Sequence, residues 1–482
     1  MSTQFFHGIR SRSTVAGAVP IPEVATAVIG LVGTAPIHHT ASPAFVAHKV
    51  FASTRDLDDV QLAGPQIAGY SIPAALDDIR AELGSTVVFI NVFDPATHKT
   101  DVAEATLTIA ADKTIKLAHG DLISLVVKTT ADPAVTCVEG TDYTADRITG
   151  VITILPGGAL AAAASAKVTY SYGNPGAVDD DDIIGTITAG GLRVGAQALL
   201  SAQAELGYKP KILIAPEYSS SPAVQQALDL LASKLLGICL ADAPLGATPQ
   251  EVISGRLPDN DLSLLSTSEL TLYCYPQLKV PATGGGTKLR PYSPALAGLV
   301  ARVDRTEGYW VSPSNHQLRR AIGLELPLTA SIDDDTCDVN LINAAGIVTV
   351  FSAGTSGRRA WGNRNASFPS TQSVMSFVPV VRTMQTVRES IQNGVMNRLD
   401  GPISWRLIKA VLDDVNAFIA RLVSEGALTP GSIVEARPEN NPPAQLAAGK
   451  IKFTGPVMPP PPAEQFEFDL TVDTNLLANV FA

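Results

Sequence analysis

The sequence predicts a multidomain protein of the mixed α+β and α/β type, with a mixed sheet core and flanking helices, an inserted small β-sandwich domain, and extended N- and C-terminal arms. Three observations predict this arrangement. Apolar strand-like runs alternate with helical patterns on both sides of a central region, residues 97–173 break into short alternating segments, and proline clusters lie near both ends. The 482 residues allow about three domains at roughly 150 residues each.

The core domain is expected from residues 23–95 and 175–357, after an N-terminal arm over residues 1–22. Strands that alternate with helices indicate a mostly parallel sheet with helices on its faces. The run TVVFINVF at residues 86–93 is typical of a strand buried on both faces. Further strands are predicted at 28–32, 211–215, 238–241, 270–275 and 347–351, and helices at 72–83, 191–206, 221–236 and 293–303.

The inserted domain is expected over residues 96–174. Its segments alternate apolar and polar residues, and turn signals such as His119-Gly120-Asp121 and Asp132-Pro133 separate them. Several short strands at this spacing favour a small all-β sandwich.

The C-terminal domain, residues 358–455, contains two amphipathic patterns that predict helices over 382–399 and 404–425. Gly426 is placed as the stop of the second helix. One stripe of that helix is expected to face the core, and its members are Trp405, Ile408, Leu412, Val415, Ile419 and Leu422.

The C-terminal arm, residues 456–482, begins with a proline spacer and continues as QFEFDLTVD. Phe466, Phe468, Leu470 and Val472 alternate with polar residues, which predicts a strand with one apolar face. A strand needs a ladder partner for its N–H and C=O groups. Two alternatives follow: the strand closes its own sheet, or it adds to the sheet edge of a neighbouring molecule.

Composition and charge narrow the classes of function. Hydrophobic residues make up 46% and charged residues 17%, so disorder driven by charge is excluded. The net charge of −11 argues against a nucleic-acid-binding protein. Residues 358–452 nevertheless hold 12 basic and 7 acidic residues. No continuous apolar helix indicates membrane insertion, and four widely spaced cysteines are expected to be reduced thiols.

Two cations near the start of the second C-terminal helix have two explanations. Arg406 and Lys409 lie where the helix dipole disfavours positive charge. Lys409 can pair with Asp413 at i,i+4. Alternatively, both cations face an acidic partner.

No catalytic or cofactor motif emerges from the residues. Ser356 lies in a Gly-Thr-Ser segment slightly like that of subtilisin-type serine hydrolases, but no His-Gly-Thr segment accompanies it. The pair His38-His39 has no nearby Cys or carboxylate in sequence, which favours a surface loop over a metal site. The prediction is a non-enzymatic protein with no cofactor and no metal.

The C-terminal third resembles the tail sheath proteins of contractile-tailed bacteriophages of the Mu- and P2-like kind. Trp361, Gly362 and Arg364 are similar to that family's Trp-Gly-x-Arg segment, while Asn365 replaces the common Thr. The segment that ends at Trp405 and the closing QFEFDLTVD run also match, and the ordered set carries the resemblance.

The resemblance implies a structural subunit that polymerises with itself as stacked hexameric rings around a tail tube protein and contracts to drive the tube through the host envelope. It implies a virion tail protein assembled in the host cytoplasm, with baseplate and tail terminator proteins as further partners. The inserted domain would lie on the outer surface of the sheath. The C-terminal domain would lie inside and face the tube, with Arg406 and Lys409 in contact with it. A phage-derived injection particle would use a similar sheath. Both arms would pair with neighbouring subunits, the N-terminal one through Thr14, Val15, Ala16 and Val19.

Overall fold

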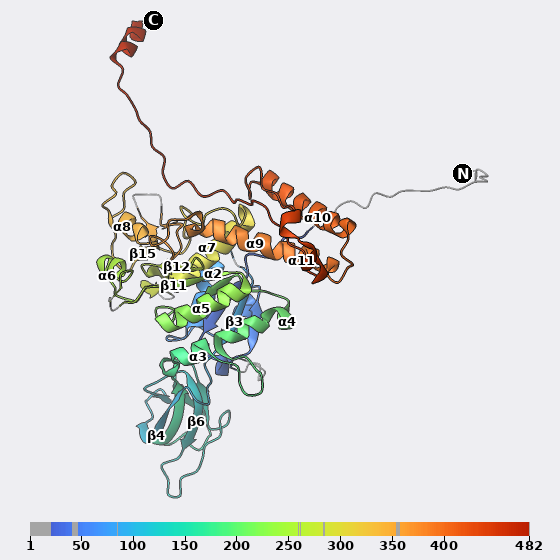
Figure 1. Ribbon diagram of the computed structural model, residues 1–482. Helices are drawn as coiled ribbons and strands as arrows, with labels where there is room; N and C mark the ends of the chain where they lie inside the picture. Colours follow the sequence, from blue (N-terminus) through green and yellow to red (C-terminus); the bar gives the residue numbers. More distant parts are fainter. Residues whose placement is uncertain are drawn as a thin grey trace, which may run out of the picture.

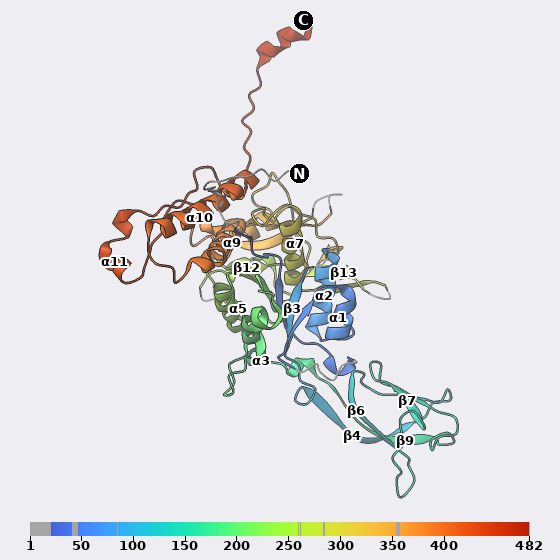
Figure 2. The ribbon, with the colours of Figure 1, turned by 90° about the vertical axis from the view of Figure 1, so that its right-hand side faces the viewer.

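A computed structural model of the chain describes residues 21–40, 47–83, 85–258, 260, 262–282, 285–352 and 357–481. The predicted N-terminal arm strand, with Thr14, Val15, Ala16 and Val19, lies outside the described residues, as does Ser356. In both ribbon views the inserted domain lies at one end of the molecule and the C-terminal helices lie at the other (Figures 1 and 2).

An eight-stranded sheet forms the centre of the core, in the order β17-β16-β12-β11-β10-β1-β3-β2. The six inner strands run parallel, and the two edge strands β17 and β2 pair antiparallel with their neighbours. The strands are β1 Ile29–Gly33, β2 Val50–Ser53, β3 Val87–Asn91, β10 Ile212–Ile214, β11 Ile238–Asp242, β12 Thr271–Cys274, β16 Ile347–Phe351 and β17 Arg359–Trp361.

Helices cover both faces of this sheet, with α5 (Pro222–Leu235) on one side and α1 (Asp56–Ala63), α2 (Ser71–Ala81) and α7 (Tyr292–Thr306) on the other (Figure 2). Because successive strand residues point to opposite faces, one strand supplies two cores. Phe89 joins the cluster with α2 and α7, whereas the adjacent Val88 and Ile90 join the cluster with α5.

Shorter elements complete the core. A second sheet of three strands consists of β13 (Leu278–Pro281), β14 (Thr287–Arg290) and β15 (Gly323–Leu324). The short helices are η1 (Ile37–His39), η2 (Pro175–Ala177), α3 (Asp180–Ile184), η3 (Gly195–Ser201), α4 (Ala202–Leu206), α6 (Pro249–Ser254) and α8 (Asp338–Ala344).

The inserted residues form two three-stranded antiparallel sheets around their own apolar cluster. Lys99 pairs with Gly173, so the insert's first and last strands are ladder neighbours where they join the core. One sheet is β4 (Lys99–Thr108), β9 (Ser165–Gly173) and β6 (Leu122–Lys128), and the other is β5 (Thr114–Lys116), β8 (Val151–Ile154) and β7 (Tyr143–Asp146).

Two long helices, α9 (Val378–Val395) and α10 (Trp405–Glu425), dominate the C-terminal region. Shorter helices accompany them: η4 (Val374–Ser376), η5 (Met396–Arg398), η6 (Pro438–Asn440) and α11 (Pro443–Ala447). The last one, η7 (Thr474–Phe481), lies at the far end of the extended C-terminal arm (Figure 1). Buried ion pairs hold α9 against the core. Arg382 contacts Asp304 of α7 at 2.6 and 2.7 Å, and Glu389 pairs with Lys211 and Lys209. Burial lowers the pKa of Lys211 to about 8, against the opposing effect of Glu389.

The mixed α+β fold class is confirmed, while several boundaries differ from the predicted ones. The helix predicted over 382–399 begins earlier, because Pro379 fits the first helical turn, and it ends at Val395. The helix predicted over 191–206 is divided: Gly195–Ser201 form the 3-10 helix η3, and only Ala202–Leu206 form an α-helix, α4. The strand predicted within 466–472 is not formed in the single chain, where residues 457–473 have no regular structure.

Candidate assembly interface

The C-terminal arm is held to the body of the protein at Met458 and leaves it only after Glu464. Thr429 donates both its backbone N–H and its hydroxyl to the Met458 carbonyl, at 2.8 and 3.0 Å. Pro459 is still buried, whereas residues 465–477 are all exposed. The last part of the chain runs outward from the domains as an extended trace (Figure 1).

The four apolar side chains of the predicted arm strand are all exposed. Their exposed fractions are 77% for Phe466, 79% for Phe468, 87% for Leu470 and 92% for Val472. No strand among the described residues pairs with them. An apolar stripe of this kind is typical of a segment that becomes buried against a partner.

An ion pair between Arg364 of the body and Glu464 holds the start of the arm in place. The Arg364 Nε lies 2.9 Å from Glu464 Oε1, and the Nη2 contacts the other carboxylate oxygen. The guanidinium also lies 3.7 Å from the ring centroid of Phe377 and 4.7 Å from that of Phe368. Stacking and a two-point ion pair fix the direction in which the arm departs.

Trp361 ends the edge strand β17 of the large sheet, and Gly362 forms the turn that follows it. Trp361 is in register with Thr349 of β16, and its ring lies 4.7 Å from that of Phe351. Gly362 has φ +120°, and a Cβ there would lie 2.6 Å from the side-chain amide of Asn343. This part of the segment on which the resemblance rests therefore has a structural role, because only glycine fits the turn after β17.

The start of α10 presents cations and an apolar ring to solvent. Lys409 pairs with Asp413 at 2.9 Å, and both side chains are more than half exposed. Arg406 is exposed and has no ion pair among the described residues. Trp405 is 69% exposed, so its predicted place on the buried stripe is wrong. The core stops short of the first turn of the helix, where Val411 is the first buried residue.

Sequence reasoning missed an apolar patch on the connection between α9 and α10. Met396 is 65% exposed and Leu399 is 70% exposed, and Trp405 at the start of α10 is 69% exposed. The helix predicted over 382–399 included Met396 and Leu399, whereas α9 ends at Val395 and the two residues lie in η5 and at its end. Arg406, the neighbour of Trp405 in sequence, adds an exposed cation to this stretch of exposed apolar residues.

The histidine pair His38-His39 is not on a surface loop, contrary to the prediction. Both side chains are less than 10% exposed, and both Nε2 atoms contact Asp121 Oδ1, at 2.7 and 2.8 Å. The carboxylate comes from the inserted domain, 82 residues away in sequence, so local sequence could not reveal it. This contact joins the insert to the core.

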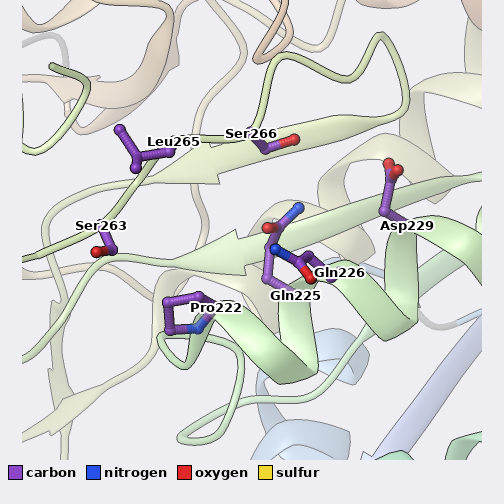
Figure 3. Close-up of a pocket in the computed structure, with 7 residues that line it drawn as sticks. All are labelled: Pro222, Gln225, Gln226, Asp229, Ser263, Leu265 and Ser266. Atoms are coloured by element: carbon purple, nitrogen blue, oxygen red, sulfur yellow. The ribbon is translucent and has the colours of Figure 1, made fainter. Parts of the chain in front are cut away.

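A pocket of about 370 Å³ lies between α5 and the segment at Ser263–Ser266 (Figure 3). Asp229 lines it, but its carboxylate already accepts hydrogen bonds from the Ser268 and Thr271 hydroxyls. The remaining lining is uncharged, and it consists of Pro222, Gln225, Gln226, Ser263, Leu265 and Ser266. The pocket therefore lacks a nucleophile–base pair. Among the described helices, none has both the length and the apolar character to cross a bilayer.

Comparisons with known proteins agree with this architecture. The family model described as the phage tail sheath protein central domain matches residues 191–366, and that of the phage tail sheath C-terminal domain matches residues 370–473. A model described as a protein of unknown function matches residues 93–179, which correspond to the insert.

Relatives and solved structures extend the match over nearly the whole chain. The tail sheath protein of Burkholderia phage BcepMu is 39% identical over 480 residues, covering 99% of this chain and 98% of that protein. The tail sheath protein of Escherichia phage P2 is 28% identical over 300 residues, covering 62% of this chain and 72% of that protein. The contracted helical sheath of the anti-feeding prophage has the same fold, with a TM-score of 0.60 and 16% identity, covering 98% of this chain and 100% of that chain. The chain belongs to the phage tail sheath family and is a structural subunit of a contractile tail sheath.

Proposed function

We propose that this subunit polymerises as stacked hexameric rings around a tail tube, and that each C-terminal arm completes a sheet in an adjoining copy. The observation that carries the proposal is the exposed stripe of Phe466, Phe468, Leu470 and Val472 on an unpaired segment. Burying one such side chain contributes roughly 1.5–3 kcal/mol. Ladder hydrogen bonds add to this while leaving the donor body free to rotate about the spacer.

The same proposal gives the N-terminal arm, with Thr14, Val15, Ala16 and Val19, a matching role. Two strands exchanged per subunit would keep neighbouring copies connected while other contacts break during contraction. The subunit would then work as a non-enzymatic structural polymer in the virion tail, assembled in the host cytoplasm and joined to baseplate and terminator proteins at its ends.

The surface formed by Met396, Leu399, Trp405 and Arg406 is the proposed contact with the tube. Exposed ion pairs of a cation such as Lys409 contribute only about 0–1 kcal/mol each. Contacts of that size can break one after another as the subunits move outward. In the sheath before contraction, burial of Trp405 against the tube would add a hydrophobic contribution to the binding free energy of the same interface.

The arm assignment is tested by placing a charge on one face of the arm at a time. Phe468→Asp and Leu470→Asp alter the apolar face, whereas Thr471→Asp places the same charge on the opposite face. We expect the first two to abolish sheath polymers in negative-stain microscopy and sedimentation, with an unchanged melting temperature of the subunit. Wild-type polymers from Phe468→Asp and Leu470→Asp would contradict the arm assignment.

A phage-derived injection particle is a second setting for the same subunit. The anti-feeding prophage sheath and the PVC sheath of an extracellular contractile injection system, the latter with a TM-score of 0.59, share this fold. Microscopy of the complete particle separates the two settings, because a phage tail carries a head and an injection particle does not.

A further inference from the structure

The junction between the core and the inserted domain concentrates two imidazoles on one carboxylate oxygen. His38 and His39 lie in η1 of the core, and Asp121 lies just before β6 of the insert. Adjacent residues of a 3-10 helix point about 120° apart, yet these two rings have centroids only 4.2 Å apart. The packing therefore turns both rings toward a single point.

The surroundings also position the carboxylate. Asp121 has φ +56°, in the left-handed region, and its Oδ2 accepts a 2.6 Å hydrogen bond from the Tyr70 hydroxyl. A Cβ at Gly173 would overlap both the Tyr70 hydroxyl and the Asp121 carboxylate, so glycine is required beside the cluster. A second residue holding the free oxygen of a ligating carboxylate is typical of metal sites.

Both imidazoles reach the same carboxylate oxygen, although Asp121 offers two. The two Nε2 atoms lie 2.7 and 2.8 Å from Oδ1, so three potential ligand atoms converge on one point. The side chains of His38, His39 and Asp121 are 9%, 6% and 10% exposed, so water has little access to them.

The donor set fits a zinc-type cation. Two imidazole nitrogens and one carboxylate oxygen lie within 4.8 Å of one another. Tetrahedral Zn²⁺ with bonds of about 2.0–2.1 Å requires ligand atoms roughly 3.3 Å apart. The present separations of 2.7 and 2.8 Å require outward shifts of about half an ångström to admit it. Imidazole ligands favour Zn²⁺ over Ca²⁺ or Mg²⁺, which prefer oxygen ligands.

We propose that His38, His39 and Asp121 bind one zinc-type divalent cation that fastens the inserted domain to the core. Tyr70 is the positioning residue, because it holds the carboxylate oxygen that faces away from the imidazoles. The ion would join two segments that the chain itself connects only through residues 94–98 and 174–179.

The test is a titration of ZnCl₂ into the EDTA-treated full chain by calorimetry, with metal content measured after gel filtration. We expect one bound ion per chain and a melting temperature that rises with Zn²⁺. His39→Gln and Asp121→Asn should lose this binding, and Tyr70→Phe should weaken it roughly 10–100-fold.

His316→Gln is the matched control, because His316 also contacts a carboxylate, Glu307 at 2.9 Å, but as a single imidazole. It should bind Zn²⁺ like the wild type. Circular dichroism and limited proteolysis establish that each variant is folded, and His39→Gln keeps the test valid if Asp121→Asn releases the insert. Absence of stoichiometric binding in the wild type, or equal binding in all variants, would overturn the proposal and leave a hydrogen-bonded joint only.

Discussion

The ion pair between Arg382 and Asp304 is expected to decide whether α9 stays attached to the core. Arg382 is 6% exposed and Asp304 is 1% exposed, and two contacts of 2.6 and 2.7 Å join them. Asp304→Asn keeps the size of the side chain but leaves the guanidinium charge buried without its counter-ion. Breaking a buried pair in this way costs about 3–5 kcal/mol.

The matched control is Asp413→Asn, which breaks the Lys409 pair on the surface. Those side chains are 60% and 56% exposed, so the expected loss is below about 1 kcal/mol. At about 1 °C per kcal/mol for 482 residues that unfold together, Asp304→Asn should lower the melting temperature by roughly 3–5 °C and the control by less than about 1 °C.

Differential scanning calorimetry and urea unfolding measure this difference on the purified subunit. Replacing both partners, Arg382→Met with Asp304→Leu, should recover much of the lost stability, because no buried charge is then left unpaired. Equal melting temperatures for Asp304→Asn and Asp413→Asn would refute the reasoning that this pair fastens α9 to α7.

Two further predictions concern the core. Gly362→Ala should lower the free energy of unfolding by about 1–3 kcal/mol, because it forces a side chain into a positive-φ turn and against Asn343. The control is Gly207→Ala, which has φ +76° but open space around it, and it should cost less in the same urea titration. Equal losses of stability in the two variants would contradict this. Burial raises the pKa of Asp242 to about 6, against hydrogen bonds from Ser293. An acid with a raised pKa stabilises the fold in its neutral form, so the contribution of Asp242 to the free energy of unfolding should fall by about 3 kcal/mol as pH rises from about 3 to about 7. Asp242→Asn should remove this dependence, and an unchanged pH profile would exclude Asp242 as its source.

Much of the fold could be predicted from local patterns. Residues 347–351 form β16 with the predicted boundaries, and the helix predicted from Ser404 begins there because the Ser404 hydroxyl accepts from the Leu407 N–H. These elements can be predicted because a few adjacent residues are enough to determine a buried strand or an N-cap. The strands of the insert could also be predicted, because the alternation of apolar and polar residues and the turn residues are local features of the sequence.

The candidate interface and the histidine cluster could be predicted less well from the sequence, because they depend on contacts between distant residues and between subunits. Asp121 meets His38 and His39 only after the insert folds back onto the core. Trp405 fits the helical stripe by spacing, but the core ends before it. The residues around Phe468 alternate as in a strand, but a strand forms only when its backbone groups pair with a neighbouring strand. No strand among the described residues pairs with this segment.

The way in which the insert is attached has a practical consequence. Lys99 and Gly173 face each other across an antiparallel ladder, and the Asn174 N–H donates to the His98 carbonyl at 2.9 Å. Antiparallel neighbours have Cα atoms about 5 Å apart, so a very short turn can replace everything between them. The position is therefore suited to grafting: a foreign domain with adjacent termini could be exchanged for the native one, and every copy along a sheath would then display the same cargo.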